Sequence, residues 1–265
     1  MKPSTEMPSK TYPSTGRCAY CLNEFELDDL TDEHVIPLAL SGRYILEKGA
    51  CKTCNGGASQ RYEQKALNTN FLVPRLLLEL KRRRKKSKPP KKLPPISLNA
   101  SSIADTTFDI ECELSQYPPK FEWLVLPIPG KLGGPNQGSG LSTLRIQILN
   151  LGVKLSVERR PVGTRVIMDH TAFALSIAKI GYCYAIGELE FGGFDGSEIR
   201  DLLAGRRDDT YNFVGSASDW SDIRLQQLHR LSYHVEQGML VVRVALFASC
   251  GACPLPVVLG PVTTP

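Results

Sequence analysis

At 265 residues, with 42% hydrophobic and 22% charged residues, the sequence has the composition of a soluble globular protein with one large domain or two modest ones. No apolar run reaches the roughly 18 residues of a membrane-spanning helix, which argues against a membrane protein. The net charge of +5 is unevenly distributed: residues 1–95 carry 18 Lys and Arg against 10 Asp and Glu, whereas residues 96–265 carry 14 against 17. The basic N-terminal third predicts a polyanionic partner.

The first 16 residues are rich in Pro, Ser and Thr and lack the apolar stretch of a secretory signal, so we expect a flexible leader. The expected compartment is a reducing cytoplasm, or the nucleus in a eukaryote. In such a compartment, paired cysteines indicate metal binding rather than disulfides.

Two Cys-x-x-Cys pairs follow the leader, Cys18 with Cys21 and Cys51 with Cys54, and 29 residues lie between them. Each pair offers two thiolates to one ion, so that the two pairs complete a closed, tetrahedral and therefore structural zinc site. Residues 18–57 contain too few apolar residues to fold unaided. We therefore expect this module to unfold without zinc.

Residues 58–86 have a helical pattern, in which Pro74 forces a break or a new helix start. Residues 81–95 then form a stiff, basic, Pro-rich linker, because nine of the first twelve are basic and four of the fifteen are prolines. We place the domain boundary there. Six of these residues are the expected nucleic-acid contacts, through salt-sensitive phosphate binding: Lys81, Arg82, Arg83, Arg84, Lys85 and Lys86. A solvated linker and a nuclear localisation patch are the alternative interpretations.

Residues 96–265 predict an α+β domain with a mostly antiparallel sheet. Strands are expected at residues 107–114, 121–126, 144–149, 153–158, 228–235, 240–248 and 255–259. Helices are expected at residues 170–186 and 197–204, the second with Ser197 as its N-cap. Lys179 interrupts the apolar run of the first helix, which is typical of a buried helix rather than a membrane span.

Between the cysteine pairs stand Glu33 and His34, followed by a Val-Ile-Pro step, and Asn55 comes directly after Cys54. A plain zinc ribbon needs none of these polar residues. With this combination the sequence resembles the HNH (ββα-metal) endonuclease family, specifically its members with a four-cysteine zinc site. The resemblance covers residues 17–65, about a fifth of the chain. It implies a small zinc-stapled ββα-metal module at residues 17–80, ahead of the larger α+β domain.

The resemblance also implies roles for individual residues. His34 would be the general base that removes a proton from the attacking water. Glu33 and Asn55 would hold one divalent cation, Mg²⁺ or Mn²⁺, and cleavage would leave a 5′-phosphate. The sequence departs from the family in having Glu33 where Asp is more usual, and in lacking the later His of the motif. Of the two polar residues on the helix face of Asn55, Ser59 and Glu63, we prefer Glu63 as the third ligand.

Other interpretations of these residues remain open. Glu33 and His34 point to opposite faces of a strand unless it twists or ends there, and they could instead form a surface turn. Asn55 could be a helix N-cap. A third Cys-x-x-Cys, Cys250 with Cys253, lacks a partner pair, and we interpret it as a strand end or hairpin, with a redox or metal role as the alternative. Three histidines lack metal-like spacing and are expected to be structural: His170, His229 and His234.

The leading hypothesis is an endonuclease that hydrolyses DNA, with RNA as the alternative substrate and residues 96–265 serving targeting, oligomerisation or regulation. A homodimer is expected if both strands are cut. HNH modules are attached to such domains in restriction, mobile-element and anti-phage systems, which suggests defence by analogy alone. Two other hypotheses are a non-catalytic, zinc-stabilised nucleic-acid-binding protein, and a nuclease that is silent until its C-terminal domain binds a ligand or protein partner.

Overall fold

The computed structural model describes residues 5, 7–80, 93–99, 107–111, 113–135, 140–141, 143–151, 162–164, 168–220 and 224–263. It is an α+β fold with mostly antiparallel sheets, as predicted. The strands are β1 Lys10–Tyr12, β2 Leu30–His34, β3 Tyr44–Cys51, β4 Ile96–Asn99, β5 Thr107–Ile110, β6 Lys120–Val125, β7 Arg145–Asn150, β8 Val162–Thr164, β9 Arg230–Glu236, β10 Met239–Ala245 and β11 Leu255–Pro261. The helices are α1 Lys52–Ala58, α2 Gln64–Asn68, α3 Leu72–Leu77, α4 His170–Leu189, α5 Ser197–Leu203 and α6 Thr210–Phe213.

The N-terminal module contains the ββα unit. Strand β3 lies between β2, which is antiparallel to it, and β1, which is parallel. Helix α1 follows β3 directly and continues through a π-helical turn, Ser59–Glu63, into α2. Pro74 lies in the first turn of α3, where its missing N–H costs no intrahelical hydrogen bond.

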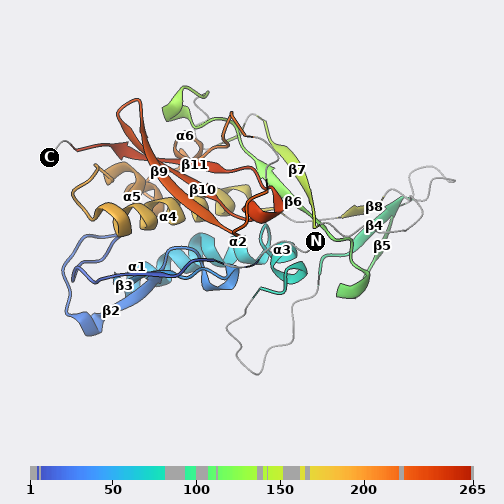
Figure 1. Ribbon diagram of the computed structural model, residues 1–265, viewed down its shortest axis with the longest axis horizontal. Coiled ribbons are helices and arrows are strands. Elements are labelled where there is room, and N and C mark those ends of the chain that lie inside the picture. Colours follow the sequence, from blue (N-terminus) through green and yellow to red (C-terminus); the bar gives the residue numbers. More distant parts are fainter. Residues whose placement is uncertain are drawn as a thin grey trace.

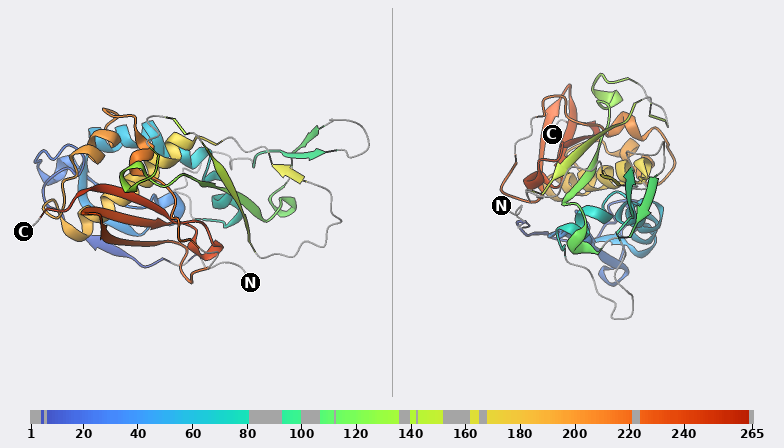
Figure 2. Two further views of the ribbon diagram at one scale, coloured as in Figure 1. Left: turned by 90° about the horizontal axis from the view of Figure 1, so that it is seen from above. Right: turned by 90° about the vertical axis from the view of Figure 1, so that its right-hand side faces the viewer.

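The later strands form three antiparallel sheets, with the orders β11-β10-β9, β5-β4-β8 and β6-β7. Figure 1 shows the β9–β11 sheet and the N-terminal module on opposite sides of α4. The left view of Figure 2 shows the β4–β5–β8 sheet at the far end of the molecule from the C-terminus.

Helix α4 is the central element of this arrangement. It packs so closely that a side chain at Gly181 would collide with Val257 of β11, and one at Gly187 would collide with the ring of Tyr12 of β1. By length and composition α4 is the one helix among the described residues that could cross a membrane, yet 78% of the apolar window is buried inside the protein. It is therefore the core helix that the interruption by Lys179 suggested.

The buried core is shared by both halves of the chain. One continuous cluster joins Tyr62 and Phe71 of the module to Trp123, to Phe173 of α4 and to Phe247 after β10. The rings of Phe71 and Phe173 lie 5.5 Å apart, centroid to centroid. The boundary predicted at residues 81–95 remains a prediction, but the two parts that it would separate are packed together.

Several details differ from the sequence-based expectations. Residues 10–12, within the expected flexible leader, form β1 because Tyr12 is buried against α4. The strand expected at residues 107–114 ends at Ile110. The N-cap of α5 is Gly196 rather than Ser197, and the carboxylate of Asp195 accepts a hydrogen bond from the Ser197 N–H at 2.9 Å. The strand expected at residues 153–158 and the basic run at residues 81–92 lie outside the described residues.

Candidate active site

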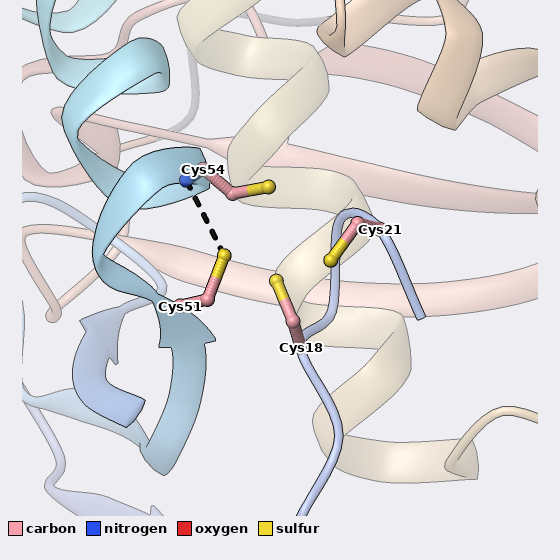
Figure 3. Close-up of side chains that lie close together, drawn as sticks. All are labelled: Cys18, Cys21, Cys51 and Cys54. Atoms are coloured by element: carbon pink, nitrogen blue, oxygen red, sulfur yellow. Dashed lines mark hydrogen bonds between the residues drawn. The ribbon is translucent and has the colours of Figure 1, made fainter. Parts of the chain in front are cut away.

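The two cysteine pairs meet at one end of the ββα unit. Cys51 ends β3 and caps α1, where its sulfur accepts a hydrogen bond from the Cys54 N–H at 3.5 Å. The two pairs are joined by a hydrogen bond from the Ala19 N–H to the Gly49 carbonyl, at 2.9 Å. Figure 3 shows the four sulfurs turned toward one another, and all of them lie within 4.8 Å of each other. Four clustered thiols on two Cys-x-x-Cys turns are compatible with a closed, structural zinc site.

Glu33, the expected cation ligand, is 3% exposed and points into the protein. Its carboxylate forms an ion pair with Lys179 of α4, and the same ammonium lies 3.0 Å from Oε1 of Glu63. Glu63 comes from the π-helical turn, which is packed against α4. The structure therefore brings Glu33 and Glu63 together, as the hypothesis requires, but around a lysine that the sequence did not associate with either residue.

Lys179 is the charged centre of this buried cluster. Burial alone would lower the pKa of Lys179, but the carboxylates of Glu33 and Glu63 outweigh burial and raise that pKa well above its ordinary value. Burial raises the pKa of Glu33, and the nearby ammonium opposes that shift. The ammonium therefore stays charged inside the protein because it has carboxylate partners.

His34 is the last residue of β2 and is half-buried. Its neighbour Val35 donates its N–H to the Tyr44 carbonyl at 2.9 Å, so the pairing with β3 continues just past the strand end. The carbonyl of His34 accepts a hydrogen bond from Lys179. The Nδ1 atom of the ring is buried. Because side chains alternate along a strand, Glu33 and His34 are expected on different sides of β2.

Asn55 lies inside α1 rather than at its N-cap, which is Cys51. Its amide donates to Oγ1 of Thr31 in β2 at 2.9 Å, and that hydroxyl donates to the Ala50 carbonyl in β3 at 3.0 Å. Asn55 therefore ties the helix to both strands of the unit. Ser59, the other polar residue considered on this helix face, accepts a hydrogen bond from Gln64 at the surface.

A divalent cation held by Glu33, Asn55 and Glu63 does not fit this arrangement. The two carboxylates already compensate an ammonium, and Glu33 is closed to the water and phosphate that an open catalytic site must admit. Within the described part of the chain, the four cysteines are the one group of three or more Cys, His, Asp or Glu donors close enough to share an ion.

The remaining histidines and the last cysteine pair are held by contacts within the fold. His229 is buried between the Leu40 carbonyl and the Phe247 N–H, at 2.7 and 3.0 Å. His170 contacts the Tyr211 hydroxyl at 2.5 Å, and exposed His234 pairs with Glu236. Both Cys250 and Cys253 are buried free thiols in the connection from β10 to β11, as the hairpin interpretation expects. The predicted nucleic-acid contacts at Lys81 to Lys86 lie outside the described residues.

Lys179 stands out in the sequence, but the sequence does not indicate its partners. The available signal was a single lysine in a strongly apolar helix, because a buried ammonium requires a carboxylate. Nothing in the spacing of the sequence selects Glu33 and Glu63 from the 27 acidic residues of the chain.

Comparison with known families gives one match. Residues 18–71 match the family model described as HNH endonuclease, and this range contains all four cysteines together with Glu33, His34, Asn55 and Glu63. No curated protein and no solved structure matches the chain.

Proposed function

We propose that this protein is an endonuclease that hydrolyses phosphodiester bonds in DNA with His34 as its general base, because residues 18–71 match the family model described as HNH endonuclease. The observation that carries the proposal is the position of His34. It ends β2 in a ββα unit whose opposite end carries the four cysteines. The residue is half-buried, and its carbonyl accepts a hydrogen bond from Lys179.

The proposed role of His34 follows from its protonation chemistry. A neutral imidazole accepts a proton near neutral pH, where the side chain loses its charge. Because Nδ1 is buried in a residue that is partly exposed, we assign Nε2 to the attacking water. Nε2 takes a proton from that water as its oxygen forms the new bond to phosphorus. The bond from phosphorus to the 3′-oxygen then breaks and leaves a 5′-phosphate.

Two features support a polyanionic substrate. The family is one of nucleases, and residues 1–95 carry the excess of positive charge, with 18 basic against 10 acidic residues. The same features support RNA as an alternative. The family also implies a divalent cation. We propose no ligands for this cation, because Glu33 and Glu63 surround Lys179.

The test is cleavage of supercoiled plasmid by zinc-loaded full-length protein, with Mg²⁺, Mn²⁺ or EDTA, beside the His34→Ala variant. Loss of a general base should slow cleavage by about 10²- to 10⁴-fold. His234→Ala is the matched control, since His234 is exposed and pairs only locally, with Glu236. Equal cleavage by wild type and His34→Ala would refute the role of His34.

A folded, zinc-loaded wild type that leaves plasmid intact in all three conditions would refute constitutive DNA cleavage. A structured RNA substrate and a gel-shift measurement with intact plasmid separate the remaining hypotheses. RNA cleavage would change the substrate class, whereas binding without cleavage of either nucleic acid would favour a non-catalytic binding protein or a nuclease that is silent until its C-terminal domain binds a partner.

A further inference from the structure

The buried cluster at Lys179 is not explained by core packing. Lys179 is 1% exposed and comes from the centre of α4, whose neighbouring residues on the same helix are apolar or small. A buried ammonium is unfavourable unless it is paired and hydrogen-bonded, and a hydrophobic side chain of similar volume would fill the same space without that cost. The residues around the ammonium therefore point to what the lysine does.

Among the described residues, the oxygens that contact the ammonium come from the N-terminal module. Two are carboxylate oxygens, from Glu33 of β2 and Glu63 of the π-helical turn. The other two are main-chain carbonyls at the end of β2, those of His34 and, at 3.5 Å, Val35. A side chain from residue 179 thus completes the hydrogen bonding of a strand end about 145 residues earlier in the chain.

These contacts fix the main chain on both sides of His34. Strand β2 is at the edge of its sheet, with β3 on one side, where His34 is paired with Ile45 and the Val35 N–H reaches Tyr44. The carbonyl of His34 is held from another element, by the ammonium. An edge strand normally leaves such groups to solvent. Here they are held by a buried charge, so the backbone that carries the imidazole is bonded in two directions.

Tyr62 and Tyr20 show that the cluster is built into the contact between the module and α4. The ring of Tyr62, next to Glu63, is 1% exposed. The hydroxyl of Tyr20 lies 3.7 Å from Sγ of Cys183, one helical turn after Lys179. The module therefore places polar groups against one face of α4, and Lys179 is the charged side chain of that face that pairs with them.

We propose that Lys179 is a positioning residue for His34, supplied by the C-terminal half of the chain, and that the nuclease centre is complete only when α4 is docked on the module. This proposal rests on the proposed role of His34 as general base. Lys179 does not touch the substrate, because it is buried. It acts by holding the end of β2, and through it the position of the imidazole relative to the bound phosphodiester.

The experiment compares wild type, Lys179→Met and the control Cys183→Ala as zinc-loaded, full-length proteins. Cys183→Ala alters the same face of α4, where the sulfur of Cys183 lies 3.7 Å from the Tyr20 hydroxyl of the module. For each protein, kcat and KM for plasmid nicking are measured below the unfolding transition and corrected for the folded fraction. The ring signals of the four histidines are recorded by NMR at one pH, with His34 assigned from His34→Ala.

We expect Lys179→Met to lower kcat about 100-fold with KM within twofold, because a misplacement of about 1 Å can cost that much. We also expect the His34 ring signals to move, whereas Cys183→Ala leaves both readouts near wild type. A Lys179→Met protein that is less stable but cleaves like wild type per folded molecule, with unmoved His34 signals, would overturn the proposal. Movement of those signals in a protein whose wild type does not cleave nucleic acid would support the positioning and refute the nuclease function.

Lys179→Met leaves a buried carboxylate without its partner and could prevent folding. The second comparison therefore sets Glu33→Gln against the double variant Glu33→Gln with Lys179→Met. The single variant keeps the lysine with Glu63 and the His34 carbonyl, whereas the double variant removes both buried charges of the pair. A double variant at least tenfold slower than the single one, with a further shift of the His34 signals, supports positioning. Equal rates and equal signals contradict it.

Discussion

Acidification from pH 8 to pH 5 should weaken the contact between the two halves of the chain through His229. This side chain is 1% exposed and links the Leu40 carbonyl of the N-terminal module to the Phe247 N–H after β10. Only a neutral ring can serve both partners, with Nε2 protonated to donate and Nδ1 bare to accept. Burial lowers the pKa of His229 to about 4.

The sign and size of the effect follow from linkage. The folded-state pKa lies below the unfolded value of about 6.5, so the unfolded chain binds a proton that the folded protein excludes. The stabilisation is fully present above pH 6.5 and is lost as the pH falls toward 4. With these two values, His229 alone should cost about 2 kcal/mol of unfolding free energy between pH 8 and pH 5.

The assay is urea unfolding at pH 8, 6.5 and 5 with excess zinc, on wild type and His229→Gln. Glutamine retains a donor and an acceptor but does not titrate. The variant should be about 1–2 kcal/mol less stable than wild type at pH 8, and this deficit should vanish by pH 5. Protonation of the cysteines and of the carboxylates affects both proteins equally, so it cancels in the difference between their unfolding free energies. A difference between the two proteins that is the same at pH 8 and pH 5 would refute the assignment.

Two further outcomes are expected. One zinc ion should co-purify with each chain, and chelation should abolish hydrogen-exchange protection across residues 18–58, because a closed four-cysteine site contributes its binding energy to folding; a metal-free protein with unchanged protection would contradict this. A fragment of residues 1–80 should bind zinc yet unfold without cooperativity, because removing α4 exposes Tyr62 and Phe71 and leaves Glu33 without its ammonium. Near-UV circular dichroism of the fragment during thermal unfolding tests this prediction. A sharp transition with a native signal would show that the module folds alone.

Features with short-range signals could be predicted from the sequence. The spacing of Cys18, Cys21, Cys51 and Cys54 carries the geometry of a zinc site, because each pair is a local turn and one ion needs two such turns. The apolar run around Lys179 likewise predicted a buried helix, and α4 extends three residues beyond the expected end. In both cases the determining interactions lie within one element or one motif.

Contacts between distant elements could not be predicted. Tyr12 forms part of β1 because its ring packs against α4. No residue near position 12 indicates that contact. The assignment of Glu33 and Glu63 to a cation came from the family pattern, and the structure shows both carboxylates around Lys179. A pattern limited to residues 18–71 contains no information about an ammonium at position 179.

The geometry of β3 separates the four-cysteine cluster from the contacts that the C-terminal half makes with the module. Cys51 ends β3 opposite Leu30, whereas His34 pairs with Ile45 near the other end of the strand. At about 3.3 Å per residue these two ends lie roughly 20 Å apart, and between them the pairing of β2 with β3 is interrupted by a bulge. Zinc bound by the four cysteines would therefore fix the end that carries α1, but it would not reach the end that carries the imidazole. That end is held by Lys179 at the carbonyl of His34 and by His229 at the carbonyl of Leu40, and both residues come from beyond residue 95.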